Sequence, residues 1–177
     1  MGLSARLPAQ PDDERAATER ALDPEKRLQH ALDLGYRFLG KRDRTVAEVR
    51  RHLEARDVEP ATVDEALDEL ARAGYLDDER YARRFAEDRR ALDGWGRERI
   101  ERRLAEVGVA RDVIAGALSG PGLGDELTAA VELLRRRLPA PPADDAGRNR
   151  ALGLLARRGY ELELAHDAIR AFAREAG

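Results

Sequence analysis

The segment VRRHLEARDV, residues 49–58, decides the fold because two related segments follow it at equal intervals. IERRLAEVGV occupies residues 100–109 and ALGLLARRGY occupies residues 151–160, each 51 residues after the one before. Apolar residues stand at the first and fifth positions of all three segments: Val49, Leu53, Ile100, Leu104, Ala151 and Leu155. Residues four apart share one face of an α-helix, so each segment predicts a helix with one buried side. Self-similarity at a fixed period predicts a tandem repeat.

The end of each segment predicts a tight helix cap. Asp57 precedes Val58, Gly108 precedes Val109, and Gly159 precedes Tyr160. Glycine, and less readily Asp, tolerates the left-handed conformation that ends many helices, and an apolar residue after it packs back on the helix. Matching apolar positions follow each cap at Leu67, Leu118 and Ile169. Each repeat therefore predicts a further helix after the turn.

These patterns predict an all-α fold of three tandem three-helix bundles with a period of about 51 residues. The expected repeats are 24–76, 77–120 and 121–177, the last with a Pro-rich internal connection. Bundles of about 50 residues are marginally stable alone, so we expect them to stack into an elongated, curved molecule. Residues 1–23 lack an apolar period and are expected to form a disordered tail.

Composition excludes several classes of protein. The 177 residues carry 35 acids and 32 bases, and the formal charge of −3 excludes a uniformly basic nucleic-acid coat but not a local basic face. The absence of cysteine excludes disulfides, thiolate zinc sites and cysteine nucleophiles. No apolar run approaches the ~20 residues of a membrane helix. We therefore expect a soluble, cytoplasmic protein with no membrane contact.

The polar residues predict no enzyme, no cofactor and no metal site. His30, His52 and His166 lack the i, i+4 spacing of a zinc-binding helix. Ser4 and Ser119, the two serines of the chain, lie in a tail and before a Gly-rich turn, so neither suits a Ser–His–Asp centre. The remaining chemistry is charge displayed on helix faces.

Arginines concentrate between residues 79 and 104, where nine arginines stand among six acids. We expect a helix here to bury Tyr81, Phe85 and Leu92. Its opposite side then carries Arg83 and Arg90, which are seven residues apart and point nearly the same way. On the next helix, Arg99 and Arg102 are expected to point outward, and Arg103 is expected to lie on the flank.

The full set of candidate contacts to a partner or to DNA is Arg83, Arg90, Trp95, Arg99, Arg102, Arg103, Arg148, Arg150, Arg157 and Arg158. Such basic faces can bind phosphates or an acidic protein groove. The alternative is a solvated face with pairs such as Glu98–Arg102. Trp95 lies between two glycines. Its side chain is either exposed and available for docking, or packed over the seam between the helices of the bundle, and the sequence does not decide between these two alternatives.

Two motifs resemble the most characteristic segments of the RecX family of recombinase regulators. They are GYLDDERYA at residues 74–82 and GWGRERI at residues 94–100. TVAEVRRHL at 45–53 and LARRGY at 155–160 resemble the flanking repeats of that family. The resemblance runs in the right order from about Lys26 to the C-terminus, and the tail and the Pro-rich connection carry no motif.

The resemblance implies a non-enzymatic helical regulator built from tandem three-helix repeats, and we expect it to be a monomer. Its implied partner is the filament of the RecA recombinase on single-stranded DNA, in whose groove or at whose growing end it binds. It would thereby restrain ATP hydrolysis, strand exchange and coprotease activity, in DNA repair, recombination and the SOS response. The resemblance supplies no catalytic residue, so the candidate contacts rest on helix face and charge.

Two other functions stay open at this point. Three-helix units resemble helix-turn-helix modules, which favours a DNA-binding regulator. Against it, no single helix combines the Asn, Gln and Arg residues that read base edges. The third interpretation is a helical adaptor that binds protein without nucleic acid.

Overall fold

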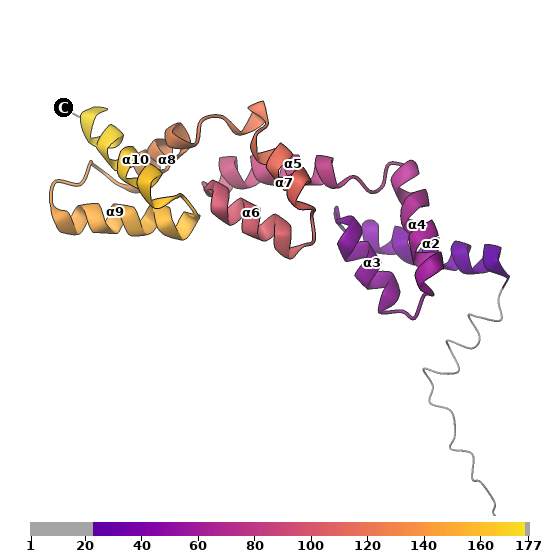
Figure 1. Ribbon diagram of the computed structural model, residues 1–177. Helices are drawn as coiled ribbons and strands as arrows, with labels where there is room; N and C mark the ends of the chain where they lie inside the picture. The colour runs from indigo at the N-terminus through magenta and orange to yellow at the C-terminus, as the bar shows by residue number, and fades with distance from the viewer. Residues whose placement is uncertain (1–22, 176–177) are drawn as a thin grey trace, which may run out of the picture. The chain divides into compact units, whose positions relative to one another are not determined.

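The structure is a computed structural model that describes residues 23–175, and these are helical throughout, with turns and loops between the helices (Figure 1). No strand occurs within that range. The chain divides into two compact units, Met1–Asp77 and Asp78–Gly177. The all-helical fold expected from the sequence is confirmed, whereas the count of three repeats and their boundaries stay predictions. The expected tail, residues 1–23, lies outside the described residues except for Asp23.

The first unit is a three-helix bundle in which each helix packs against the other two. Its helices are α2 (Pro24–Leu39), α3 (Val46–Glu54) and α4 (Pro60–Arg72). Pro24 and Pro60 occupy the first turns of α2 and α4, where a missing N–H leaves no hydrogen bond unmade. A capping box starts α3: Glu48 N–H donates to Thr45 Oγ1 at 3.1 Å, and Thr45 N–H donates to Glu48 Oε2 at 3.2 Å.

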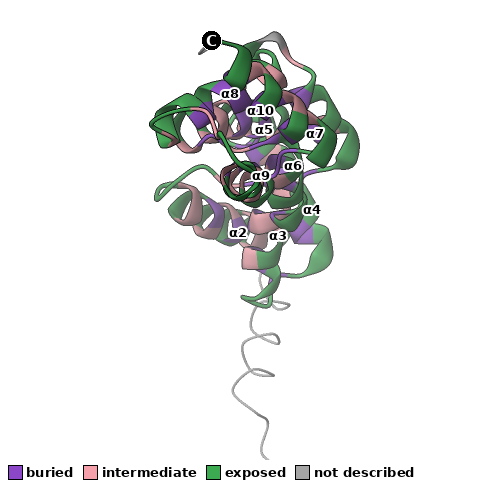
Figure 2. Cartoon of the chain, turned by 90° about the vertical axis from the view of Figure 1, so that its left-hand side faces the viewer, coloured by how far each residue is buried: buried purple, intermediate pink, exposed green. Residues whose placement is uncertain are grey.

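The core of the first unit is a single apolar cluster with contributions from all three helices. Its buried members include Val49, Leu53, Val58, Val63, Leu67 and Leu70. Full burial of one such side chain stabilises a fold by about 1.5–3 kcal/mol. Buried residues (purple) alternate with exposed ones (green) along the helices in Figure 2, which is the pattern of one apolar stripe per helix.

The second unit contains six α-helices and two short turns of other helix types. They are α5 (Asp78–Asp88), the π-helical turn η1 (Arg89–Asp93), α6 (Arg97–Glu106), α7 (Arg111–Leu118), the 3-10 turn η2 (Pro121–Leu123), α8 (Glu126–Arg137), α9 (Asp145–Arg158) and α10 (Leu162–Glu175). One apolar cluster joins α5, α6 and α7 around Ile100 and Leu104. A second joins α8, α9 and α10 around Leu134 and Leu155.

The caps expected at the three repeated turns are present. Asp57, Gly108 and Gly159 have positive φ angles of 60°, 92° and 82°. The N–H of the next residue donates to the carbonyl five positions earlier, for Val58 to Leu53 at 3.3 Å, Val109 to Leu104 at 3.1 Å and Tyr160 to Leu155 at 3.2 Å. The side chains of Val58, Val109 and Tyr160 are buried. A left-handed residue thus ends α3, α6 and α9, and a buried residue anchors each turn.

One prediction about helix faces is wrong. Leu92, expected to be buried, is 76% exposed. Arg90, expected to project outward, has a side chain only 10% exposed. The cause is η1, because a π-helical turn holds more residues than an α-helical turn and so rotates the side chains that follow Asp88.

Candidate partner-binding site at the Trp95 junction

Three half-buried aromatic side chains line one edge of the second unit. Tyr81 and Phe85, one turn apart on α5, lie nearly parallel with ring centroids 6.1 Å apart. Trp95, in the loop before α6, meets Phe85 edge-on, again at 6.1 Å between centroids. All three pack on the cluster around Leu104, and part of each ring stays exposed. Trp95 therefore covers the bundle seam and still presents ring surface.

Two arginines stack on these rings. The Arg99 guanidinium carbon lies 4.3 Å from the Trp95 ring centroid. That of Arg89 lies 5.3 Å from the Phe85 centroid and 5.6 Å from the Trp95 centroid. Arg89 Nη1 also donates to Asp93 Oδ2 at 2.6 Å. A cation–π contact stabilises by about 0.5–1 kcal/mol at an exposed site, and it orients the planar guanidinium.

The N-terminus of α6, just after Trp95, contacts the C-terminus of α9 (Figure 1). Gly96 N–H donates to Arg158 O at 2.7 Å, and Glu98 N–H donates to Gly159 O at 3.1 Å. The first N–H groups of α6 thus satisfy the last carbonyls of α9, and the positive end of one helix dipole faces the negative end of the other. Arg99 Nη1 adds a hydrogen bond to Arg157 O at 2.8 Å. Together these contacts form the Trp95 junction.

Glycine is required at both contact points of the junction. A Cβ at Gly96 would lie within 3.0 Å of the Gly159 carbonyl, closer than real Cβ atoms come. A Cβ at Gly159 would meet the Arg99 backbone and Cβ at similarly short distances. Gly159 also has a φ of 82°, which other residues rarely adopt. The two glycines therefore allow the close approach of α6 and α9.

A buried polar group lies beneath the junction. Arg90 Nη2 is 3.5 Å from Glu126 Oε1, which also accepts a hydrogen bond from Arg97 N–H at 2.6 Å. The Arg90 guanidinium lies 5.9 Å from the centroid of the Tyr160 ring. Burial raises the pKa of the Tyr160 phenol above its ordinary 10.0, against the opposing Arg90 charge, so Tyr160 is neutral at physiological pH. Arg90 thus serves the interior of the second unit.

The junction brings together several of the residues that the sequence singled out. Trp95 and Arg99 form its stack, Arg157 contributes its carbonyl, and Arg158 Nη1 donates to Asp93 O. Arg102 lies on the same flank of α6 as Arg99, is exposed, and makes no side-chain hydrogen bond or ion pair within residues 23–175.

The other candidates lie apart or are paired. Arg103 is exposed on α6 and pairs with Glu106 at 2.8 Å. Arg148 pairs with Asp145 at 2.6 Å, while Arg150 is exposed on α9. Arg83 lies away from the junction, in a cleft between α5 and α7. Whether any of the ten touches a partner stays a prediction.

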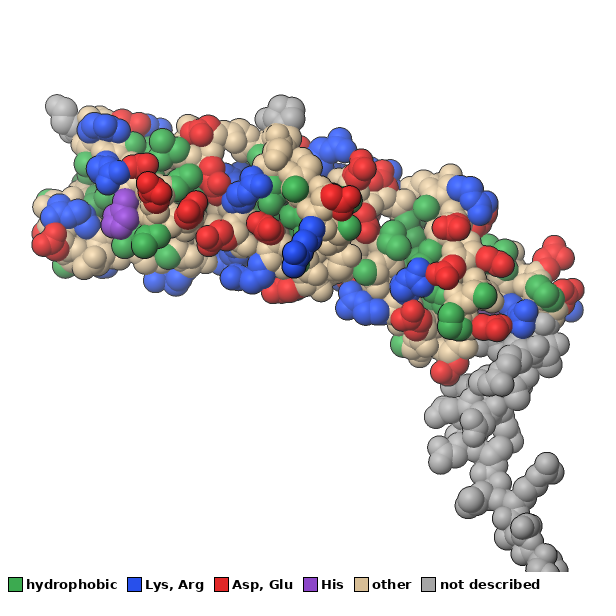
Figure 3. Space-filling model, viewed as in Figure 1, with side chains coloured by type: hydrophobic (Ala, Val, Ile, Leu, Met, Phe, Trp, Pro, Cys, Tyr) green, Lys and Arg blue, Asp and Glu red, His purple; other side chains and the backbone are tan. Residues whose placement is uncertain are grey.

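The surface around these residues mixes both signs of charge. Figure 3 shows acidic side chains (red) and basic side chains (blue) interspersed over the visible face. Among the described residues, no group of three or more His, Asp or Glu is placed to hold a metal ion. Within the same range, no helix is both long and apolar enough to cross a bilayer. The distinctive chemistry is the pairing of guanidinium groups with aromatic rings.

Comparison with known proteins identifies the family. The family models described as "RecX, first three-helix domain" and "RecX, second three-helix domain" match residues 31–70 and 77–118. The regulatory protein RecX of Mycolicibacterium vanbaalenii is 36% identical over 154 residues, which cover 82% of this chain and 84% of that protein. The RecX of Mycolicibacterium smegmatis is 33% identical over 170 residues, covering 93% and 90%. The chain belongs to the RecX family.

A solved RecX structure shares the fold. The crystal structure of RecX from Lactobacillus salivarius aligns with a TM-score of 0.72 and 17% sequence identity, over 84% of this chain and 97% of that one. The sequence relatives therefore confirm the motif resemblance to RecX. The similar fold of the solved RecX structure confirms the helical architecture. Because the relatives are named regulatory proteins, the chain has a regulatory role.

The second RecX three-helix domain contains one side of the Trp95 junction, and α9, beyond the two matched domains, contains the other. Sequence reasoning missed Arg89, although Tyr81, Phe85 and Arg89 recur at every fourth residue and so share a helix face. It also missed the contact between Gly96 and Gly159. No local sequence pattern predicts that contact, because Gly96 precedes α6 whereas Gly159 follows α9, far away in the sequence.

Proposed function

We propose that this RecX-family protein binds the RecA–single-stranded DNA filament and slows its ATP hydrolysis, and with it strand exchange and coprotease activity. It acts without catalysis of its own, as a cytoplasmic monomer, in DNA repair, recombination and the SOS response. Family membership and the regulatory role of the RecX relatives support the proposal. Direct contact with the single-stranded DNA inside the filament is part of it.

The observation that carries the proposal is the stack of Arg99 on Trp95 at a junction fixed by backbone hydrogen bonds. Trp and Arg dominate the binding energy of protein interfaces. A guanidinium already held against a ring loses little freedom when it binds, so less of the interaction energy is spent on ordering. Its free N–H donors suit phosphates and carboxylates, both of which a protein–DNA filament displays.

Arg102 extends this surface along α6. It is exposed and unpaired within the described residues, so it can reach a partner without breaking an internal ion pair. Arg103 on α6 and Arg157 on α9 are further exposed cations of the second unit. If these groups meet DNA phosphates, binding weakens with added salt in proportion to the number of phosphates neutralised.

The test is ATP turnover by RecA from the same organism on single-stranded DNA, with increasing amounts of this protein. We expect turnover to fall at stoichiometric or lower amounts. Unchanged turnover at several-fold excess over RecA would overturn the proposal. Tight, sequence-specific binding to duplex DNA together with unchanged turnover would favour the helix-turn-helix regulator instead.

A further inference from the structure

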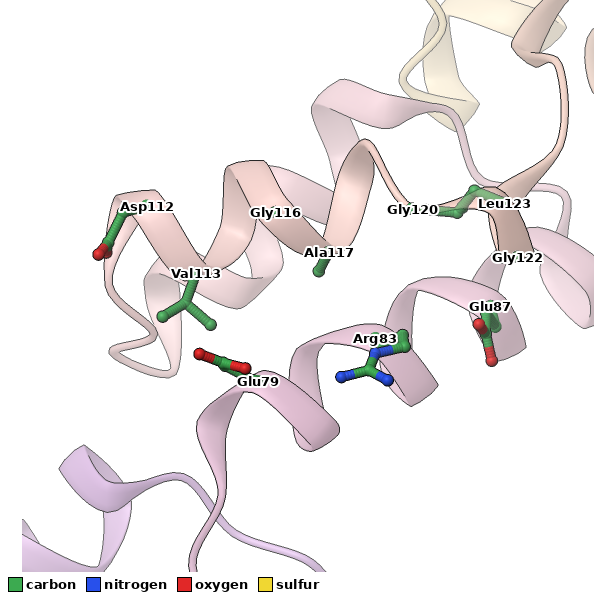
Figure 4. Close-up of a pocket in the computed structure, with 10 residues that line it drawn as sticks. All are labelled: Glu79, Arg83, Glu87, Asp112, Val113, Gly116, Ala117, Gly120, Gly122 and Leu123. Carbon is green, nitrogen blue, oxygen red and sulfur yellow. The ribbon is translucent and has the colours of Figure 1, made fainter.

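A cleft of about 510 Å³ lies between α5 and α7, on a different side of α5 from the aromatic row. Figure 4 shows Glu79, Arg83 and Glu87 along the α5 wall, facing α7. The opposite wall begins at Asp112, and the turn η2 closes one end. The cleft therefore has walls from three elements of one unit.

The charges of this cleft are mostly negative and unpaired. Three carboxylates, Glu79, Glu87 and Asp112, line it with one cation, Arg83. None of the four makes a side-chain ion pair or hydrogen bond with the residues that the structure describes. The carboxylates are not grouped closely enough to hold a metal ion together. Their charge is thus spread along the cleft and available to a cationic partner.

The floor of the cleft is apolar and open. Val113, Ala117 and Leu123 supply it. Gly116, also in the lining, has no atom within 4 Å of the position that a Cβ would take, so α7 leaves room there. An apolar floor beneath distributed carboxylates fits a long aliphatic stem that ends in a positive charge, which describes Arg and Lys.

We propose that this cleft receives an Arg or Lys side chain from the protein component of the bound filament. The inference rests on the proposed function and assigns the two sides of α5 to different parts of the partner. The carboxylates of the cleft repel DNA phosphates and attract basic side chains. The stack of Arg99 on Trp95, on the other side of α5, presents the opposite charge. Arg83 opposes this attraction, but the three carboxylates of the lining outnumber its single positive charge.

The first experiment tests the cleft without the filament. A tri-arginine peptide is titrated into the full-length protein while the methyl resonances of Val113, Ala117 and Leu123 are followed by NMR, with tri-glutamate as the control peptide. We expect shifts with tri-arginine alone, and their loss in the double variant Glu79→Gln/Glu87→Gln. Absent shifts, or equal shifts in the double variant, would overturn the proposal.

The second experiment fills the cleft without changing its charge. Gly116→Leu adds a side chain where the structure has open space, so the helix is expected to form normally. Ala115→Leu, at the exposed neighbouring position outside the lining, is the matched control. We expect Gly116→Leu to weaken binding to the RecA–DNA filament by about tenfold, as loss of an anchored side chain does, and Ala115→Leu to leave it unchanged.

The outcomes separate the two proposals. Equal filament binding by both leucine variants overturns the cleft assignment and leaves the proposed function intact. A wild-type protein that fails to bind the filament overturns the proposed function and with it the assignment of the partner, while the peptide titration still decides whether the cleft accepts a basic side chain.

Discussion

At the scale of single residues, Gly96 and Gly159 decide how closely α6 and α9 approach. Backbone hydrogen bonds of 2.7 and 3.1 Å cross this contact, and a Cβ on either glycine would intrude on the other segment. The Arg99–Trp95 stack sits directly beside it. A change at either glycine therefore alters the geometry of the stack without touching its side chains.

We expect Gly159→Ala to destabilise the second unit by about 2–5 kcal/mol, from the left-handed backbone and the steric overlap together. Gly74→Ala is the control, because Gly74 has a similar φ of 77° but open space at its Cβ position. That control should cost about 1–2 kcal/mol, the backbone contribution alone. Chemical denaturation followed by circular dichroism measures both, and equal costs would mean that the close approach contributes nothing.

His52 gives the first unit a pH dependence. Its ring stacks on Phe38 with centroids 3.7 Å apart, and its Nδ1 lies 3.0 Å from Arg56 Nη1. Burial, and then the positive charges of Arg56, Arg44 and Lys41, lower the pKa of His52 below 6.5. The unfolded chain therefore binds the proton more readily than the folded one.

The stabilising contribution of neutral His52 is thus complete above about pH 6.5 and declines as the pH falls from there through the folded-state pKa. His52→Phe keeps an aromatic ring against Phe38 and removes the titration. The thermal unfolding midpoint should decrease between pH 7.5 and pH 5, and this decrease should be smaller in the variant than in the wild type. Identical falls would contradict a lowered pKa.

At the scale of elements, the repeated leucines show what the sequence could predict. Leu53, Leu104 and Leu155 were expected on buried stripes from their spacing, and all three are fully buried. The left-handed caps after them were predictable because glycine or Asp before an apolar residue has a local conformational cause. Helix-forming patterns act over a few residues, so the sequence displays them directly.

The π-turn η1 and the Trp95 junction were not predictable in the same way. Residues 89–93 carry no glycine or proline to mark a change of helix type, so an α-helical period assigned Leu92 inward and Arg90 outward, both wrongly. The junction joins residues that are distant in sequence, and Arg90 is drawn inward by Glu126 of α8. Tertiary contacts of this kind override local periodicity.

The contrast between Leu104 and Leu92 can be measured. Leu104→Ala removes a fully buried side chain and should destabilise the second unit by about 2–5 kcal/mol. Leu92→Ala changes an exposed side chain and should stay within about 0.5 kcal/mol of wild type. Urea denaturation midpoints compare the two, and a large cost at Leu92 would restore the inward assignment made from the sequence.

At the scale of the whole molecule, the chain belongs to a family of regulatory proteins. The second unit presents an aromatic–arginine surface at the Trp95 junction and a carboxylate-lined cleft between α5 and α7. The RecX motifs indicated the family, and the fold explains why Trp95 lies between two glycines: Gly96 must approach α9 closely, and Gly94, at a φ of 63°, ends η1.

A binding site at the Trp95 junction is tested by measuring how Arg102→Glu and Arg174→Glu bind the filament. Both arginines are exposed, and neither makes a side-chain ion pair or hydrogen bond within the described residues, but only Arg102 borders the Trp95 junction. We expect Arg102→Glu to weaken binding to the RecA–single-stranded DNA filament about tenfold or more. Arg174→Glu should bind as the wild type does, and both variants should unfold as it does. Equal losses in the two variants, or no loss in either, would contradict a binding site at the junction.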